Sequence, residues 1–330
     1  MRPLDKISFS RRSLLTGAST IAAAGALGLG ANSARAFAPM PTDQAPYLYR
    51  FKLGDSQATI VSDGILPLGE PTANFLNITK EEIQKELRDN YLPLDKIVLE
   101  QNVLVLNQAG KTIVFDTGMG GLKLFGPTTG QLMKTLRQAG IQPKDVDAVV
   151  MSHAHIDHCG GIMADDGTRN FPNAQFYITQ ADYDFWTDQQ KVGEKSKVFW
   201  ETATKNLVPN RDRMHFIRDG EEFLPGIHAI LAPGHTVGHT IFMIASGNQQ
   251  LCYIGDLAHH PVLLLEHPLT QFAYDTDPAQ SAQSRVKMLT MLADNRVPIL
   301  AYHFAWPGIG NVGKQGEGFR YYPAAEQLQQ

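Results

Sequence analysis

Cysteine is almost absent from this sequence, with only Cys159 and Cys252 among 330 residues. Two cysteines cannot build a disulfide scaffold, and they form no CxxC pair of the kind seen in zinc knuckles and thioredoxin-like sites. We expect both to be small core residues, and the sequence leaves open whether they are bonded to each other. A disulfide-rich domain is therefore excluded.

Basic residues are also few and form no run. The sequence has 29 Lys and Arg against 33 Asp and Glu, which gives a formal charge of −4. Without residues 1–36, 24 basic residues face 32 acidic ones, and the charge becomes −8. Such a surface argues against nucleic acids and anionic membranes as partners. A small, neutral or apolar substrate fits better, and the sequence leaves open a homodimer.

Long apolar runs are missing as well, which argues against stable insertion in a membrane. The apolar stretch from Leu14 to Leu29 is short and rich in Gly, Ala and Ser. It follows the twin-arginine pattern Ser10-Arg11-Arg12-Ser13 and precedes Ala34-Arg35-Ala36, a cleavage-like site. We interpret residues 1–36 as a Tat signal peptide and expect a periplasmic or secreted protein; a membrane anchor is the alternative.

No repeat or low-complexity segment divides residues 37–330, so we predict one α/β or α+β domain in which helices cover the sheets. A turn is predicted at Asp63-Gly64, and a hairpin around Gly110-Lys111. Predicted strands cover 47–53, 58–62, 102–106, 112–115, 146–151, 175–178, 228–231, 241–245, 251–254 and 299–301. Predicted helices cover 81–87, 131–139, 182–187, 198–206 and 279–292.

Metal-binding side chains are concentrated between Ser152 and Gly161, in the pattern HxHxDH. The cluster follows an apolar strand, and three further candidates also follow predicted strands. Since the carboxyl ends of neighbouring strands can bring distant residues to one point, we expect the set to converge. Its members are His153, His155, Asp157, His158, His235, Asp256 and His303.

Imidazole and carboxylate donors suit zinc, and also manganese, iron or cobalt. Seven candidates exceed the needs of one ion, whereas two divalent ions about 3.5–4 Å apart would use them all and generate a bridging hydroxide. One ion is then expected on His153, His155 and His235. The other is expected on Asp157, His158 and His303, with Asp256 bridging the two.

These motifs resemble the metallo-β-lactamase superfamily, which implies an αββα sandwich and the same seven ligands. The resemblance extends from Ser62-Asp63-Gly64 through Phe115-Asp116-Thr117-Gly118 to His303. Within the superfamily the sequence looks closest to the methyl parathion hydrolase group, on Leu124-Phe125-Gly126-Pro127-Thr128, Ala181-Asp182-Tyr183-Asp184-Phe185-Trp186 and Phe304-Ala305-Trp306-Pro307-Gly308-Ile309-Gly310. That group implies an aromatic leaving-group pocket at Phe125, Trp186 and Trp200; the alternative is that Trp186 packs one face of a helix.

The resemblance implies a binuclear hydrolase whose bridging hydroxide attacks a phosphotriester, an ester or a lactone. Asp157 or Asp256 could move a proton. A bridging Asp256, where some lactamases carry Cys, argues against the β-lactamase branch. The alternatives are an acyl-homoserine-lactone-type lactonase, a thiol-ester hydrolase, a mononuclear iron sulfur dioxygenase and a non-catalytic metal-binding protein.

Other polar residues near these motifs are expected to support the ligands. We predict that Asp63 and Asp116 are buried and order nearby loops through hydrogen bonds, and that His239 lies beside the ligands or in the core. His259, His260 and His267 depart from the organophosphate hydrolase pattern, and either a different substrate rim or a surface position would explain them.

Overall fold

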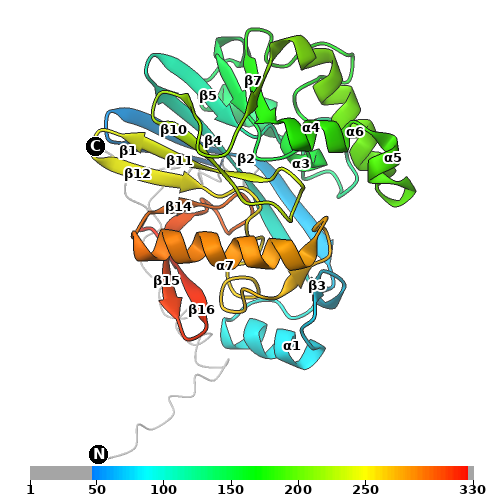
Figure 1. Cartoon of the computed structure of the whole chain (residues 1–330), viewed down its shortest axis with the longest axis vertical. Helices are drawn as coiled ribbons and strands as arrows, with labels where there is room; N and C mark the ends of the chain where they lie inside the picture. Colours follow the sequence, from blue (N-terminus) through cyan, green and yellow to red (C-terminus); the bar gives the residue numbers. More distant parts are fainter. Residues whose placement is uncertain (1–46, 326–330) are drawn as a thin grey trace, which may run out of the picture. The chain divides into compact units, whose positions relative to one another are not determined.

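Two seven-stranded β-sheets carry most of the strands in the computed structural model, which describes residues 47–325 (Figure 1). The predicted Tat signal at residues 1–36 lies outside the described residues. The first sheet has the order β1-β2-β4-β5-β6-β7-β8 and the second has the order β16-β15-β14-β12-β11-β10-β9. A third, two-stranded sheet pairs β3 (Phe75–Leu76) with β13 (Gln271–Phe272).

The first sheet changes from antiparallel to parallel pairing along its width. Its antiparallel part is formed by β1 (Leu48–Leu53), β2 (Ser56–Gly69), β4 (Ile97–Gln108) and β5 (Lys111–Phe115). Its parallel part continues from β5 through β6 (Ala148–Val150), β7 (Gln175–Thr179) and β8 (Met214–Ile217). β4 and β5 form the predicted hairpin, with Val105 opposite Val114. Parallel strands need long crossover connections, and those connections supply most of the helices.

The second sheet consists mainly of antiparallel pairs, with one parallel pair between β12 and β14. Its strands are β9 (Glu222–Leu224), β10 (Ile227–Leu231), β11 (Thr240–Ser246), β12 (Gln249–Tyr253), β14 (Ile299–Leu300), β15 (Ile309–Gln315) and β16 (Gly318–Pro323). The inner faces of the two sheets pack against each other, since the ring of Phe115 lies 5.6 Å from that of Phe242 and 5.4 Å from that of Tyr253.

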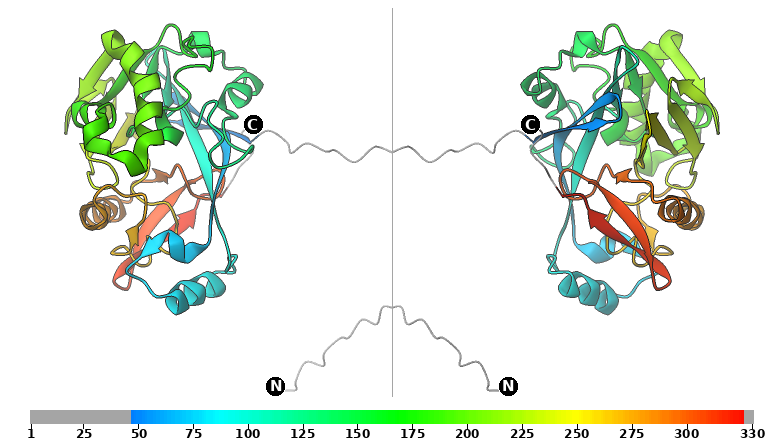
Figure 2. Two further views of the ribbon diagram at one scale, coloured as in Figure 1. Left: turned by 90° about the vertical axis from the view of Figure 1, so that its right-hand side faces the viewer. Right: turned by 90° about the vertical axis from the view of Figure 1, so that its left-hand side faces the viewer.

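Helices cover the outer faces of both sheets, which can be followed in the two side views of Figure 2. α2 (Leu132–Gln138) packs on β2, α4 (Gln180–Trp186) packs on β7, and α7 (Pro278–Asp294) packs on β15. The remaining helices are α1 (Lys80–Asp89), α3 (Ile156–Cys159), α5 (Gln189–Val192) and α6 (Lys197–Leu207). This is the predicted αββα arrangement.

The start of α1 confirms one local prediction, and the course of β2 contradicts another. α1 begins as its sequence predicts, because Thr79 and Glu82 form a reciprocal capping box. The predicted turn at Asp63-Gly64 is wrong: β2 continues to Gly69, and the pairing with β4 shifts register between Ser62 and Ile65. The extra residue forms a bulge, where Gly64 has φ +111° and a Cβ would collide with the Thr128 carbonyl.

The two cysteines are free thiols buried in the core, where burial raises the pKa of each. They are therefore the small core residues that the sequence predicts. Within residues 47–325, no helix combines the length and apolar character that crossing a bilayer requires.

Candidate metal centre

All seven predicted ligands lie at the carboxyl ends of strands. His153 and His155 lie on the loop that follows β6, while Asp157 and His158 lie on the short helix α3 that this loop enters. His235, Asp256 and His303 follow β10, β12 and β14, three strands of the second sheet that point the same way. The two sheets therefore deliver their donors to one end of the sandwich, and each side chain is buried.

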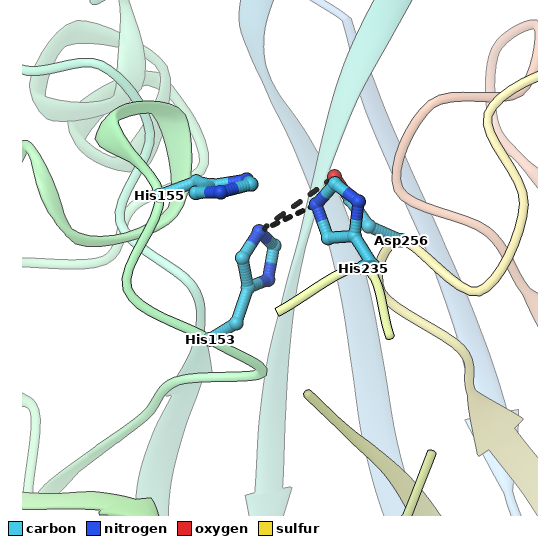
Figure 3. Close-up of side chains that lie close together, drawn as sticks. All are labelled: His153, His155, His235 and Asp256. Carbon is cyan, nitrogen blue, oxygen red and sulfur yellow. Dashed lines mark hydrogen bonds and ion pairs between the residues drawn. The ribbon is translucent and has the colours of Figure 1, made fainter. Parts of the chain in front are cut away.

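One donor group contains His153, His155, His235 and Asp256, with ligand atoms all within 4.8 Å of one another. Figure 3 shows these side chains reaching toward one another from three separate segments. The Nε2 atoms of His153 and His235 are 3.1 Å apart, and Asp256 Oδ2 lies 3.2 Å from His235 Nε2.

The second donor group contains Asp157, His158 and His303, again within 4.8 Å of one another. Asp256 adjoins this group too, since its Oδ1 lies 3.2 Å from His158 Nε2 and its Oδ2 lies 3.2 Å from His303 Nε2. Asp256 is thus the residue shared between the two groups. A carboxylate in this position has one oxygen available to each of two ions.

The buried polar atoms of the site fit divalent cations. His158 Nε2 and Asp256 Oδ1 are both buried and lack a hydrogen-bond partner, although they face each other. Unpaired buried polar atoms cost free energy, so a pair of this kind favours an ion between its members. The donor set contains imidazoles and carboxylates, which suits zinc and its neighbours in the first transition row.

Charge leads to the same conclusion. Two buried carboxylates belong to the donor groups and two more contact their histidines, whereas Arg285 is the one buried Lys or Arg among residues 47–325. Uncompensated buried charge is strongly unfavourable, so these carboxylates need positive charge close by, from protonated histidines or from bound cations. Two divalent ions would supply that charge. The carboxylates are those of Asp116, Asp157, Asp256 and Asp275.

The imidazole pKa values divide according to their neighbours. Burial, together with the positive charge of His158, lowers the pKa of His153 well below its usual value. Burial also opposes the charging of His235, yet hydrogen bonds to Asp256 and Asp275 raise its pKa to about 9. Burial disfavours the ionised form of Asp256, but the charges of His158 and His303 hold its pKa well below its usual range. The ionised Asp256 is ready to bind a metal, whereas a cation must displace the proton from His235 to bind there.

Asp116 organises the second donor group, as the sequence predicts. Its Oδ2 accepts hydrogen bonds from His158 Nδ1 at 2.9 Å, Tyr253 Oη at 2.7 Å and Ser152 Oγ at 2.7 Å. A carboxylate at Nδ1 keeps the proton there, which leaves Nε2 free to bind a metal. Thr117, the next residue, donates its backbone N–H to the His158 carbonyl at 2.7 Å. The Gly-rich loop that follows β5, residues 116–121, is therefore a support beneath α3.

Asp182 was not predicted, yet it connects the two histidine loops. Its carboxylate accepts the backbone N–H of Ala154 at 2.8 Å and that of Gly238 at 2.7 Å. Ala154 lies between His153 and His155 in sequence, so one buried carboxylate fixes loops from both sheets. The only local sequence signal at Asp182 is that it lies three residues after Thr179, the residue that caps α4.

The four other histidines that the sequence motifs singled out take four different positions. His239 is buried beside the ligands, where its Nε2 accepts the backbone N–H of Asp256 at 3.0 Å. His259 is also buried, 2.9 Å from Asp256 Oδ2, and stacks on Phe272. His260 accepts two backbone N–H groups within its own loop, whereas His267 lies at the surface near Glu86. Of these four, only His259 lines the cavity, and with Asp256 and His303 it forms a third group of possible metal donors.

A cavity opens over both donor groups. Phe125 lines it as predicted, but Trp186 and Trp200 do not. Trp186 is buried and its ring packs edge-on against His155 at 4.7 Å, which corresponds to the alternative of a helix-packing role. Trp200 does not reach the cavity; its indole N–H donates to the Thr187 carbonyl. Successive residues of an α-helix point about 100° apart, so Trp200 and the residue before it face different ways. Phe199, its neighbour, lines the cavity instead.

The family follows from a match to residues 97–303, which fit the family model of the metallo-beta-lactamase superfamily. The chain belongs to this superfamily. The matched region begins at β4 and ends at His303, so it includes all seven donors of the site.

Solved structures of this superfamily resemble the chain over most of its length. AidC, described as a dizinc quorum-quenching lactonase, is 30% identical with a TM-score of 0.79, covering 87% of this chain and 100% of AidC. A hydrolase named AbOPH is 26% identical with a TM-score of 0.81, over the same shares. An N-acyl homoserine lactonase from Bacillus cereus is 25% identical over 161 residues, which are 49% of this chain and 58% of that relative.

Two of these three relatives are described as lactonases and the third only as a hydrolase, so they favour lactonases over the methyl parathion hydrolase group that the sequence motifs indicated. Of the three segments behind that expectation, the first supplies Phe125 to the cavity, the second lies on α4, and the third is the loop from His303 into β15, so only one of them reaches the cavity. The HxHxDH motif and the later ligands do not separate the two groups. The family was therefore predictable from the ligands, but the branch was not.

Removing bound metal should lower the stability of the protein. A cation that binds only the folded state stabilises it by about 2.7 kcal/mol when the free cation concentration is about 100 times the Kd. We expect a strong chelator to lower the Tm by about 5 °C or more, and added Zn²⁺ to restore it. Differential scanning calorimetry with elemental analysis of the same samples measures both quantities. An unchanged Tm in protein shown to be free of metal would contradict the assignment.

Proposed function

We propose that this protein is a metal-dependent hydrolase that opens the ring of neutral lactones, with N-acyl homoserine lactones as the first class to test. The observation that carries this proposal is the pair of donor groups sharing Asp256 at the base of an apolar cavity. The similarity to a dizinc lactonase and to N-acyl homoserine lactonases supports it. Phosphotriesters are the second class.

The cavity wall suits a neutral substrate with an apolar chain. Apart from the donor side chains, His259 and Tyr274, the residues that line it are Leu66, Leu68, Leu99, Phe125, Ile156, Phe199 and Phe272. No Lys or Arg is among the lining residues, so an anionic substrate would find no fixed counter-charge there. Burying an acyl chain against such a wall gains about 0.8 kcal/mol for each CH₂ group.

The residues of the site have separate tasks in hydrolysis. When bound, the two divalent ions would activate water and polarise the carbonyl oxygen of the substrate. Asp157 and Asp256 line the cavity, so a carboxylate oxygen of either can accept a proton there. The apolar wall holds the substrate and excludes bulk water. Ser152 and Cys159 are buried and do not line the cavity, so neither is placed to act as a covalent nucleophile.

Zinc is the proposed metal, and export through Tat is the proposed route. The donor set and the dizinc relative favour zinc over manganese, iron or cobalt. Elemental analysis of purified protein should give two zinc ions per chain. One iron per chain would instead favour the sulfur dioxygenase alternative.

A side-by-side substrate panel tests the activity. We expect kcat/KM for N-hexanoyl and N-decanoyl homoserine lactones to exceed that for a paraoxon-type phosphotriester by about a hundredfold, since the wall matches an acyl chain. Aryl esters and a thiol ester complete the panel. A phosphotriester that is turned over faster than every lactone would overturn the proposal, and failure on every substrate would favour a non-catalytic metal-binding protein.

Phe125 provides a variant for the same panel. Phe125→Ala removes part of the cavity wall, so we expect kcat/KM for the decanoyl lactone to fall about tenfold, chiefly through KM. Leu124→Ala is the matched control, because Leu124 is 54% exposed and does not line the cavity. Equal losses in the two variants would show that Phe125 does not contact the substrate.

A further inference from the structure

Asp275 and Arg285 form a buried ion pair behind the first donor group. Asp275 lies on the segment between β13 and α7, and Arg285 lies on α7. Arg285 Nη2 is 3.8 Å from Asp275 Oδ2, and both side chains are completely buried. Buried ion pairs are poor contributors to stability compared with apolar packing, so their presence invites another explanation.

Asp275 contacts a predicted metal ligand. Its Oδ1 lies 2.8 Å from His235 Nδ1, so the carboxylate keeps the imidazole proton on that nitrogen. His235 Nε2 then remains the free donor atom, and it is this atom that faces His153 and Asp256. The arrangement repeats the contact between Asp116 and His158 in the other donor group. Each group thus has one histidine oriented by a buried carboxylate.

Arg285 extends this support to the segment that follows Asp256. Its guanidinium donates to the carbonyl of Leu257 at 2.9 Å, that of Pro268 at 2.9 Å and that of Thr270 at 2.7 Å. Leu257 directly follows Asp256, and the segment from Leu257 to Thr270 carries His259. A planar group with five N–H donors can hold several carbonyls in fixed positions, which a flexible ammonium cannot.

We propose that Asp275 is a positioning residue for His235 and that the charge of Arg285 balances that of Asp275, so that the pair sets metal affinity at the first donor group separately from the second. The inference rests on the proposed metal-dependent function. It adds a residue pair that no motif indicated. A purely structural role would require only that the pair hold the segment between β13 and α7 in place.

Metal affinity separates these roles without any assay of catalysis. Asp275→Asn keeps the shape of the side chain but removes its charge. We expect it to weaken the affinity for one of the two ions about ten- to hundredfold, because removal of a ligand's hydrogen-bond partner typically has an effect of this size. The affinity for the other ion should stay within about threefold of the wild-type value. Competition of Zn²⁺ with a chromogenic chelator measures both affinities on the full chain.

Asp277→Ala is the matched control. Asp277 lies on the same segment, is exposed, and accepts the backbone N–H of Gln280 at the start of α7. Its loss disturbs the helix start without touching His235, so both affinities should stay at the wild-type values. Wild-type affinities in Asp275→Asn, or equal weakening of one ion in both variants, would overturn the proposal.

Two further outcomes keep the test decisive. If Asp275→Asn does not fold, Asp275→Glu, which restores the charge on a longer side chain, should bind one ion more weakly and the other normally. If this variant binds both ions with wild-type affinity, or weakens both equally, the proposal is wrong. If the wild type binds two ions but opens no lactone, the proposed activity fails, whereas the affinity comparison still decides the role of Asp275.

Discussion

Asp256→Ala should remove bound metal and hydrolytic activity together. Asp256 adjoins both donor groups, with one oxygen 3.2 Å from His158 Nε2 and the other 3.2 Å from both His235 Nε2 and His303 Nε2. Its loss leaves a buried cluster of histidines without the carboxylate that the two groups share. We expect kcat/KM to fall by more than about a thousandfold, since the chemistry depends on the ions.

Metal content and rate must be measured on the same preparation of this variant. Asp95→Ala is the control, because Asp95 is exposed and distant in sequence from every donor, so it should keep two ions and the full rate. Two ions retained in Asp256→Ala at wild-type activity would show that Asp256 is not a shared ligand. Two ions retained at a low rate would instead restrict its role to the handling of protons.

The donors could be predicted because the chemistry requires unusual residues in recognisable places. HxHxDH combines three imidazoles and a carboxylate that packing does not call for, and the later donors each follow an apolar strand. The fold class follows from the alternation of strands and helices together with the family resemblance. The terminal strands β15 and β16 were not predicted, because Gly310, Gly313 and Lys314 interrupt the alternation of apolar residues.

Asp63 and Asp116 were predicted as supporting residues, but three others could not be, for a physical reason. Asp182, Asp275 and Arg285 act through contacts with residues distant in sequence, and their own neighbourhoods show only helix-capping signals or none. A buried Arg on a helix has the same local sequence as an exposed one. The prediction that Trp200 lines the cavity was wrong, because tertiary packing sets the orientation of α6. That orientation places Phe199 in the cavity wall.

Asp63→Ala should give the largest loss of stability among single carboxylate variants outside the donor set. The carboxylate is buried and accepts the backbone N–H of Leu132 at 2.7 Å, that of Met119 at 2.8 Å and that of Gly130 at 3.0 Å. It thus ties the bulge in β2 to the Gly-rich loop beneath α3 and to the start of α2. Leaving two or three backbone donors unpaired at about 1–3 kcal/mol each should lower the free energy of unfolding by about 3–6 kcal/mol.

Urea unfolding of the metal-loaded protein measures this loss, and two variants define its cause. Asp219→Ala removes an exposed carboxylate that accepts one backbone N–H, from Leu231, so it should cost less than about 1 kcal/mol. Asp63→Asn should fall between wild type and Ala, because its single carbonyl oxygen can serve the N–H groups of Met119 and Gly130 while its amide opposes that of Leu132. An Ala variant within about 1 kcal/mol of wild type would mean that water replaces the carboxylate. An Asn variant as unstable as Ala would mean that the loops require both oxygens, and so the carboxylate itself.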